Sequence, residues 1–513
     1  MKRFIFYLLF FIIMTFPYIF ALQAAGDSEQ FGGFLLNPID GNTYLAKMAE
    51  GRAGAWTFTL PYSYETHPGV FLFGFYLFLG HLSRWIGLSL PITYHAARLL
   101  AAGMLLWALS RFLKKYLSHH NLPGGEPATE NKTRLYWPCM ILCAFGSGLG
   151  WLASPFGMMT SDFWVAEAYP FLSAFTSPHF TLGGALMLFL FTQFDQMGFV
   201  NRLGFWLAGV LLGIVMPFGA VIAGLVLAGL AVWEWVKNRV VRVFPAAAVL
   251  FGAGLVVLAQ YWQVYAQPLM RAWNEQNVTT SPPVWDVLIS FSPAILFALA
   301  DIFHLIRRGG LADIEKIVLL WFVSSLVLIL IPFSLQRRFL FGFYIPTAIL
   351  AVIGINYLFP RKNRPVFAVV LVLSVLTNIL LLPGGVLAVA GGNPRLVIHE
   401  EELSAFDWLN ENSESGSVLL CSPGLGNFVP AYTQNRVLYG HPFETPHAEV
   451  MAALVDGFYS GEGGMDDELA VLSEYDVAWV IMGPREREIG RPAVLSELSL
   501  VYENGQVAIY AVK

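Results

Sequence analysis

The chain has 513 residues, of which 56% are hydrophobic and 13% are charged, and its mean hydropathy is +0.60. A soluble protein has about a quarter of its residues charged, so this composition excludes an ordinary soluble protein. The net charge of −5 is small for this length and gives no support to nucleic-acid binding. Three cysteines, two of them four residues apart in an apolar run, indicate no disulfide framework. The composition predicts a polytopic α-helical membrane protein.

Apolar runs of about the length of a membrane span recur from the N-terminus to about residue 390. The first follows Met-Lys-Arg and extends through Leu22. We predict an uncleaved first span with a cytoplasmic N-terminus; a signal peptide cleaved near Ala21 is the alternative. The later runs lie near residues 69–90, 92–113, 135–153, 181–198, 203–217, 220–236, 244–265, 285–306, 316–333, 339–358 and 365–389.

The segments between the runs fall into two charge classes. Segments rich in Lys and Arg are assigned to the cytoplasm by the positive-inside rule, and segments poor in them to the other side. If 114–134 is inside and 31–68 is outside, only one of the runs 69–90 and 92–113 crosses. Residues 69–90 contain Arg84 and several glycines, so we predict a juxtamembrane helix on the outer face; two crossings with an outward basic loop are the alternative. The basic segments are 111–134, Arg202, 237–242, 307–316 and 361–364.

The two classes predict about eleven spans, with the N-terminus inside and the C-terminal domain outside. The protein would then be a multi-pass protein of the plasma (inner) membrane. The outward segment 154–180 has no Lys or Arg, and 267–285 has only Arg271.

The first outer loop is rich in aromatic and polar residues, as a surface that handles sugar or phosphate would be. Asp40 follows Pro38 in a turn and precedes a short helical stretch. A carboxylate at the membrane face would take a proton from an acceptor hydroxyl; a helix N-cap is the alternative role for Asp40. The candidate substrate-binding residues of this loop are Tyr44, Glu65 and His67.

The second outer loop holds Asp162, Glu167 and His179 and no basic residue. Acids beside a membrane indicate a proton, a metal or a sugar as partner, and we take all three residues as candidate substrate contacts. The loop has no Asp-x-Asp and no histidine pair, so its spacing is not typical of a metal site. The alternatives are a solvated loop carboxylate for Asp162 and a structural role for His179.

Two adjacent arginines, Arg337 and Arg338, lie between two apolar runs on the outer side. Positive charge is normally kept on the cytoplasmic side, and a guanidinium pair at the outer face needs a partner. Phosphate is the natural partner because it accepts bidentate hydrogen bonds. We predict that the pair binds a lipid phosphate; two snorkelling headgroup anchors are the alternative.

A small soluble α/β domain is predicted from residue 393 to 513. Short buried strands near 417–421, 436–439 and 477–482 alternate with helical stretches near 400–410, 447–459 and 466–472. A hairpin that turns at Asn504-Gly505 ends the chain. The segment 439–447 is the densest polar cluster of the domain, and either a packed loop, which we favour, or a substrate-facing loop explains it.

Several of these features together resemble the GT-C superfamily of membrane glycosyltransferases, which includes the protein O-mannosyltransferases and the aminoarabinose–lipid A transferases. Asp40-Gly-Asn-Thr-Tyr44 resembles the acid element that follows the first span, and Glu65-Thr-His67-Pro68-Gly69 resembles the element that closes the outer loop, with Gly69 in place of a second proline. Arg98 resembles an arginine that opens the following span. The resemblance covers a membrane domain of residues 1–392, with an outer loop and juxtamembrane helix at 31–90.

The resemblance implies a polyprenyl-phosphate sugar donor and a lipid, glycan or protein acceptor. Asp40 would be the general base in an inverting transfer, and Arg337 and Arg338 would stabilise the leaving phosphate. Asp162 or Glu167 would bind the acceptor, or a divalent metal if one is used. Two alternatives are a lipid-linked-sugar transporter or flippase and a non-catalytic scaffold. A transporter would have repeated halves and charged residues within its spans, and neither is evident in the sequence.

Overall fold

The computed structural model describes the chain except residues 121–127, 197, 238–239 and 513, and it describes 128–133 by the backbone alone. The described chain divides into two compact units. Unit 1 contains residues 1–17, 95–258 and 279–384. Unit 2 contains residues 18–94, 259–278 and 385–513, so the C-terminal α/β part groups with the first outer loop.

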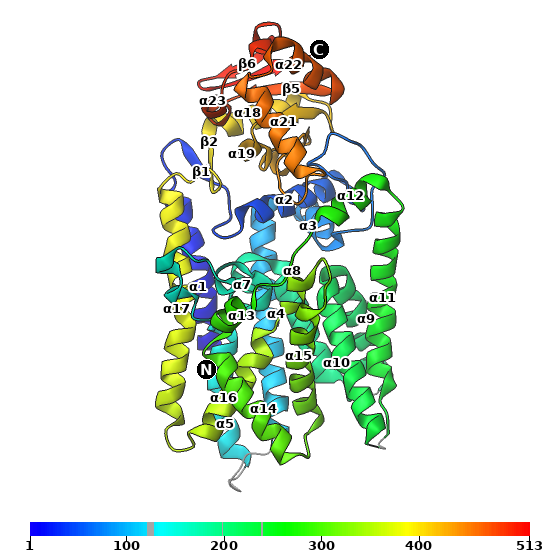
Figure 1. The fold of residues 1–513 in the computed structure, drawn as a ribbon, viewed down its shortest axis with the longest axis vertical. Coiled ribbons are helices and arrows are strands. Elements are labelled where there is room, and N and C mark those ends of the chain that lie inside the picture. The colour runs from blue at the N-terminus through cyan, green and yellow to red at the C-terminus, as the bar shows by residue number, and fades with distance from the viewer. Residues whose placement is uncertain (121–127, 197, 238–239, 513) are drawn as a thin grey trace. The chain divides into compact units, whose positions relative to one another are not determined.

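Unit 1 consists of long helices that run side by side (Figure 1). α14 packs on α16, α16 on α5, α10 on α15 and α8 on α9. A glycine permits the closest of these approaches, because a Cβ on Gly354 would lie 2.0 Å from the carbonyl oxygen of Phe297. The long helices of the chain are α1 (Lys2–Ala24), α4 (Leu90–His119), α5 (Ala128–Phe145), α8 (Pro178–Gln193), α9 (Phe199–Val215), α10 (Pro217–Val236), α11 (Val243–Tyr265), α14 (Ala294–Arg308), α15 (Asp313–Leu330), α16 (Tyr344–Leu358) and α17 (Asn363–Ala390).

Five described helices are long and apolar enough to cross a membrane, or seven if each of two bent helix pairs counts as one span. An integral membrane protein is therefore supported, whereas the predicted number of about eleven spans is not confirmed. The run 285–306 is not one straight helix: α13 (Val284–Phe291) and α14 meet at an angle of 90°. The break falls at Pro293, which has no backbone N–H for a helical hydrogen bond.

The basic segments gather at one end of unit 1. Ion pairs join Lys115 to Asp195 at 2.6 Å and Arg242 to Asp313 at 2.5 Å. Arg134 donates to the carbonyl oxygen of Pro360 at 3.3 Å. α15 leads from Asp313 over 18 residues, about 27 Å, so Arg337 and Arg338 lie toward the opposite end. Which end faces the cytoplasm stays a prediction from charge.

Unit 1 contains a buried ionisable cluster that the sequence reading missed. Asp301 of α14 is completely buried, and neither of its carboxylate oxygens has a hydrogen-bond partner. Nearby, Glu315 pairs with His120 at 2.5 Å and with Arg308 at 2.7 Å. The expectation that the spans hold no charged residue is wrong, because Asp301 lies inside the apolar run 285–306. The apolar residues around Asp301 made this segment look uniformly apolar in the sequence.

In unit 2, the helices α2 (Pro38–Ala53) and α3 (Gly74–Ile86) cross at two glycines. A Cβ on Gly51 would lie 2.1 Å from the carbonyl oxygen of Leu77, and one on Gly80 would lie 2.0 Å from that of Met48. α3 has 13 residues and a length of about 20 Å, less than the hydrocarbon thickness of a bilayer. α3 is therefore too short to cross a membrane by itself.

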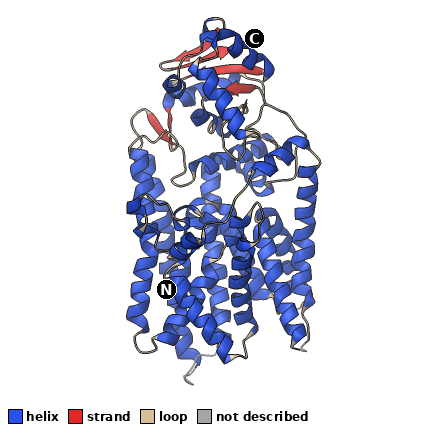
Figure 2. Ribbon diagram, in the orientation of Figure 1, coloured by secondary structure: helices blue, strands red, loops and turns tan. Residues whose placement is uncertain are grey.

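The α/β part of unit 2 contains a five-stranded sheet of order β4-β3-β5-β7-β6, with helices packed beside it (Figure 2). The first three strands are parallel, and the C-terminal hairpin adds two antiparallel strands. The predicted strands, helices and Asn504-Gly505 turn are confirmed. The elements are β3 (Val418–Leu420), β4 (Arg436–Val437), β5 (Val477–Met482), β6 (Ser499–Asn504), β7 (Val507–Ala511), α18 (Glu400–Asn412), α21 (Ala448–Ser460), α22 (Gly464–Glu474) and α23 (Pro484–Ile489).

Two short strands and a short helix of unit 2 were not predicted. β1 (Glu29–Phe31) pairs antiparallel with β2 (Val397–His399), which ties the start of the first outer loop to the start of the α/β part. α12 (Pro268–Gln276) packs its Trp273 and Met270 in an apolar core with residues of the first outer loop. Three distant stretches of sequence thus form one unit.

Candidate functional site

Asp40 lies in the first turn of α2, three residues after the N-cap position. Asn37 occupies the N-cap and has a left-handed backbone, so the alternative of Asp40 as the N-cap is wrong. Pro38 at the first helical position supplies a preset φ, and the helix dipole favours a carboxylate in this turn. The Asp40 side chain is 50% exposed. Asp40 is therefore held on a rigid helix and remains accessible.

A histidine from the C-terminal part orients the Asp40 carboxylate. The Nε2 atom of His441 lies 3.3 Å from Oδ1 of Asp40. The other ring nitrogen, Nδ1, accepts hydrogen bonds from the backbone N–H groups of Phe443 and Glu444 at 3.0 and 3.1 Å. Because Nδ1 accepts, we assign the ring proton to Nε2, which donates to Asp40. His441 is 3% exposed, so the ring position is fixed by packing.

Two helical turns further along α2, Lys47 forms an ion pair with Glu444 at 2.7 Å. The lysine side chain is 2% exposed, and its ammonium lies 4.2 Å from the centre of the Phe73 ring. Glu50 follows on the same helix, and burial raises its pKa to about 8. The nearby Lys47 charge opposes this shift and the Glu444 charge adds to it. Lys47 thus joins α2 to the loop that supplies His441.

This loop, residues 439–447, is a packed loop, as we favoured from the sequence. Gly440 permits a close approach, because a Cβ there would lie 2.7 Å from the Tyr62 ring. α12 holds the other side of the loop: Gln276 donates to the carbonyl oxygen of Thr445 at 2.5 Å and accepts from the N–H of His447 at 2.9 Å. Two polar residues of the loop, His441 and Glu444, contact side chains of α2, and the sequence could not show these contacts.

Tyr44 lies four residues after Asp40, on the same face of α2. Its ring stacks on Tyr76 with centroids 4.5 Å apart and planes 7° apart. Tyr94 lies parallel to both rings, at 6.3 Å from Tyr44 and 6.2 Å from Tyr76. Burial raises the pKa of Tyr76 well above its usual value, so its hydroxyl remains protonated. The three rings form an aromatic group beside the accessible carboxylate.

The closing element of the first outer loop is a structural turn. His67 accepts from the N–H of Leu60 through Nε2 at 2.9 Å. Its Nδ1 atom then donates to the carbonyl oxygen of Pro68 at 2.8 Å and to Gln267 at 3.1 Å. Glu65 is exposed on the same turn. His67 therefore shapes the loop with both ring nitrogens, and Glu65 is the accessible group of this element.

Asp162 of unit 1 lies in a different environment from Asp40. It belongs to the short helix α6 (Ser161–Trp164) and is completely buried. Burial raises its pKa, although hydrogen bonds partly offset the effect. The alternative of a solvated loop carboxylate is therefore wrong. Its oxygens accept from the N–H groups of Gly148 at 3.1 Å and Gly150 at 3.0 Å and from the hydroxyls of Thr160 at 2.6 Å, Thr377 at 2.8 Å and Ser290 at 3.3 Å.

Arg337 and Arg338 meet an acid of the same unit. Oε1 of Glu167, in a helical turn at Ala166–Ala168, lies 3.6 Å from Nε of Arg337 and 3.3 Å from a terminal nitrogen of Arg338. Arg337 also stacks over the Trp164 ring at 4.6 Å. The side chains of Arg337 and Arg338 are 18% and 31% exposed. Both guanidiniums thus lie near one carboxylate at a partly exposed site.

The remaining candidates of unit 1 have structural settings. His179, in the first turn of α8, packs its ring 4.0 Å from that of Phe180. Arg98 is buried and donates to the carbonyl oxygen of Phe175 at 2.9 Å, at the end of α7 (Pro170–Thr176). A guanidinium at a helix C-terminus complements the helix dipole. Arg98 thus joins α4 to the second outer loop.

Comparison with known proteins relates this arrangement to solved membrane enzymes. No family profile and no curated protein matches the sequence. Among solved structures, ArnT from Cupriavidus metallidurans bound to undecaprenyl phosphate matches with a TM-score of 0.52 and 12% identity, over 98% of this chain and 97% of that chain. The chain has the fold of the GT-C superfamily.

Two further GT-C structures match over most of this chain. The arabinofuranosyltransferase AftD from Mycobacteria has a TM-score of 0.52 at 14% identity, over 98% of this chain and 41% of that chain. The Archaeoglobus fulgidus oligosaccharyltransferase in complex with Zn and sulfate has a TM-score of 0.50 at 10% identity, over 91% and 67%. The chain thus spans less than half the length of AftD and nearly all of ArnT.

The side chains present do not fit a divalent metal. Within the described residues, no group of three or more His, Cys, Asp or Glu side chains could hold a metal ion. The Asp162 oxygens already accept from five donors, and Glu167 already faces two guanidiniums. A metal ion at either acid would have to displace these partners, so we route no chemical step through a metal.

Sequence reasoning missed Lys47, His441 and Glu444 as parts of the Asp40 site. The polar segment 439–447 was the signal for two of them, but its partner on α2 lies about 400 residues earlier. Lys47 carried the signal of being the only lysine in the sequence of the loop 31–68. In this chain, the C-terminal part completes the surroundings of the acid on α2.

Proposed function

We propose that this protein is a membrane glycosyltransferase that moves a sugar from a polyprenyl-phosphate donor to an acceptor hydroxyl at the extracytoplasmic face, with inversion. The observation that carries the proposal is Asp40, a half-exposed carboxylate fixed in the first turn of α2 and oriented by His441. The GT-C fold adds support, and so does the undecaprenyl phosphate bound to ArnT, since that ligand is itself a polyprenyl phosphate.

In the proposed reaction, Asp40 accepts the proton of the acceptor hydroxyl and becomes a carboxylic acid. The acceptor oxygen attacks the anomeric carbon from the face opposite the donor phosphate. The bond from the anomeric carbon to the phosphate oxygen breaks, and the lipid phosphate leaves with the electron pair. One displacement inverts the anomeric configuration. His441 is a positioning residue here, because its N–H fixes which way the carboxylate points.

Arg337 and Arg338 are the proposed ligands of the leaving phosphate. The two cationic side chains lie side by side at Glu167, and both are partly exposed. A phosphate gains negative charge as the glycosidic bond breaks, so a preset cation stabilises the transition state more than the ground state. Glu167 holds the two side chains in place, which limits the reorganisation on donor binding.

The acceptor-binding residues that we propose are Tyr44 and Glu65. Tyr44 shares a helix face with Asp40, and an aromatic ring offers an apolar surface to a sugar. Glu65 is exposed on the turn that His67 shapes. In this proposal, Asp162 and His179 stabilise the structure of their loop and do not contact the substrate. The acceptor class, whether lipid, glycan or protein, is left to experiment.

The test measures transfer of radiolabelled sugar from a panel of polyprenyl-phosphate sugars in membranes that contain wild type, Asp40→Asn or the control Glu411→Gln. Glu411 is an exposed acid on α18, in the same unit as Asp40. We expect Asp40→Asn to lose at least about a hundredfold in rate, as removal of a general base does, at unchanged expression. Glu411→Gln should transfer as wild type does. Arg338→Gln should raise the donor KM.

Equal transfer by wild type and Asp40→Asn would remove Asp40 from the mechanism. A wild type that transfers from no donor would favour the transporter or the scaffold. The buried cluster of Asp301, His120 and Glu315 is the observation that favours a transporter, since ionisable groups within spans often lie on ion pathways. Movement of a lipid-linked sugar across sealed vesicles, lost in Asp301→Asn but not in Asp40→Asn, would identify that function.

A further inference from the structure

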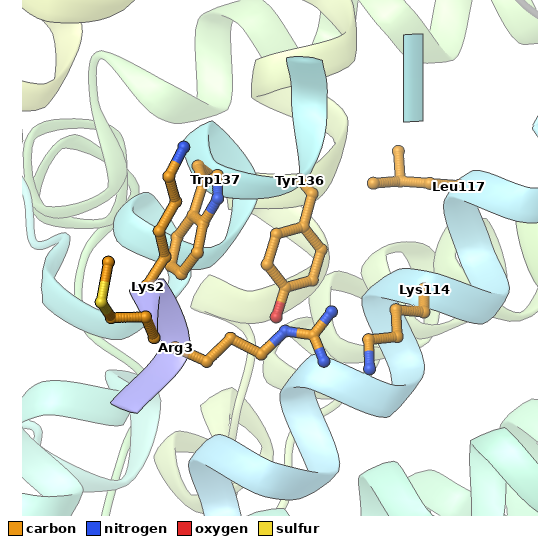
Figure 3. A pocket seen from close by; sticks show the side chains of 7 residues that line it. Lys2, Arg3, Lys114, Leu117, Tyr136 and Trp137 are labelled. Atoms are coloured by element: carbon orange, nitrogen blue, oxygen red, sulfur yellow. The ribbon is translucent and has the colours of Figure 1, made fainter. Parts of the chain in front are cut away.

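A cavity of about 550 Å³ lies at the basic end of unit 1, between α1, α4 and α5 (Figure 3). Its walls come from the first residues of α1, the last turns of α4 and the first described turns of α5. The proposed transfer reaction uses none of these residues. The lining residues are Met1, Lys2, Arg3, Lys114, Leu117, Tyr136 and Trp137.

Three cationic side chains line this cavity, and among the side chains that the structure describes no acid does. Arg3 extends toward Lys114 and the hydroxyl of Tyr136, and its guanidinium lies 5.4 Å from the centre of the Tyr136 ring (Figure 3). Lys114 is close enough to Arg3 and Arg111 to be repelled by both. No ion pair involves Lys2, Arg3 or Lys114 in the part of the chain that the structure describes. The fold thus concentrates positive charge around a cavity.

A neighbouring cavity of about 690 Å³ provides a contrast. It shares Lys114 with the first cavity, but it also contains an acid, Asp195. There Lys115 is neutralised by Asp195 at 2.6 Å and donates to the carbonyl oxygen of Thr192 at 2.7 Å. Asp195 thus supplies an anion to Lys115, whereas none of the described acids pairs with Lys2, Arg3 or Lys114 of the first cavity. An external anion would complete the first cavity.

We infer that the first cavity binds the phosphate of an anionic phospholipid from the leaflet at this end of the membrane domain. Basic pockets between spans bind lipid headgroups, and Trp137 and Tyr136 are residue types that favour the membrane interface. The apolar side chains that follow Arg3 on α1 give the acyl chains a surface: Phe4 is 71% exposed and Leu8 is 47% exposed. A free phosphate would use the cations but not this apolar face.

The positive-inside rule alone would also place cations here, so the test needs a matched pair of cations outside the cavity. Arg361 and Lys362 are exposed, and their turn lies at the same end, because Arg134 donates to the neighbouring Pro360. Arg361→Gln with Lys362→Gln removes the same charge as Arg3→Gln with Lys114→Gln. Neither Arg361 nor Lys362 lines the cavity.

The experiment is native mass spectrometry of the purified full-length protein released from detergent, with phosphatidylglycerol, phosphatidylcholine or inorganic phosphate added. We expect wild type and the Arg361/Lys362 variant to retain one phosphatidylglycerol and to bind phosphatidylcholine and inorganic phosphate much more weakly. The Arg3/Lys114 variant should bind phosphatidylglycerol at least about tenfold more weakly. Size-exclusion profiles and melting temperatures of all variants serve as the folding control.

Equal phosphatidylglycerol binding by wild type and the Arg3/Lys114 variant would overturn the inference. An equal loss in the Arg361/Lys362 variant would do so too, because it would show a general charge effect. Binding of inorganic phosphate as tight as that of the lipid would exclude a lipid site. If the Arg3/Lys114 variant fails to fold, Lys2→Gln, an exposed lining residue, replaces it, and unchanged binding there would equally overturn the inference.

Discussion

The surroundings of Asp40 and those of Asp162 show how differently one residue type is used in the two units. Asp40 is half exposed at the start of a helix and is oriented by the N–H of His441. Asp162 is completely buried and accepts from two backbone N–H groups and two threonine hydroxyls. In the sequence both are acids of loops poor in Lys and Arg. Exposure and the number of donors, rather than loop position, decide which carboxylate is available to a substrate.

The largest effect that separates the two sites is expected for Asp162→Asn. The amide nitrogen cannot accept, so donors such as the N–H of Gly148 and of Gly150 lose their partner in a buried site. Each unsatisfied buried donor costs about 1–3 kcal/mol, which predicts a loss of several kcal/mol and little folded protein. Asp40→Asn should keep the wild-type melting temperature. Thermal melting of both variants in detergent measures the two stabilities. Equal melting temperatures would contradict the different roles that we assign to Asp40 and Asp162.

The second prediction concerns the support of the Asp40 site by Lys47→Met. Removal of one partner of a buried ion pair leaves the other charge uncompensated, so we expect a loss of about 3 kcal/mol in unit 2. The double variant with Glu444→Gln should recover part of this stability. The control is Arg271→Met, which breaks an exposed pair with Glu275 and should cost at most about 1 kcal/mol. A cost no greater for Lys47→Met than for Arg271→Met would show that the pair does not anchor the loop.

Much of the fold was predictable because local patterns determine it. The apolar runs located the helices of unit 1, and the strand pattern with Asn504-Gly505 located the sheet. The bend at Pro293 was less visible, since the apolar run continues through it. For the site, sequence patterns selected Asp40, Arg337 and Arg338 as candidates but could not show how far each side chain is buried. Pairings such as Asp40 with His441 join residues 401 positions apart, and no local pattern encodes them.

The third prediction tests how Asp40 is oriented. His441→Gln should lower kcat about tenfold with little change in the acceptor KM. The acceptor would still bind, but a carboxylate that points in the wrong direction removes its proton more slowly. The expected loss is smaller than that of Asp40→Asn, because the base itself remains. Initial rates across acceptor concentrations measure the two constants. A change confined to KM would assign His441 to acceptor binding instead.

The last prediction concerns Glu50, which sharpens the comparison because it lies on the same helix as Asp40 but is less exposed. Burial raises its pKa from 4.5 to about 8 in the folded protein. The folded state therefore binds more protons than the unfolded state between these values, and stability falls as pH rises through this window. The melting temperature of wild type should drop from about pH 5 to about pH 8, and that of Glu50→Gln should drop less. If the melting temperatures of the two proteins changed with pH in the same way, Glu50 would already be ionised at low pH, and its carboxylate would be solvated in the folded protein.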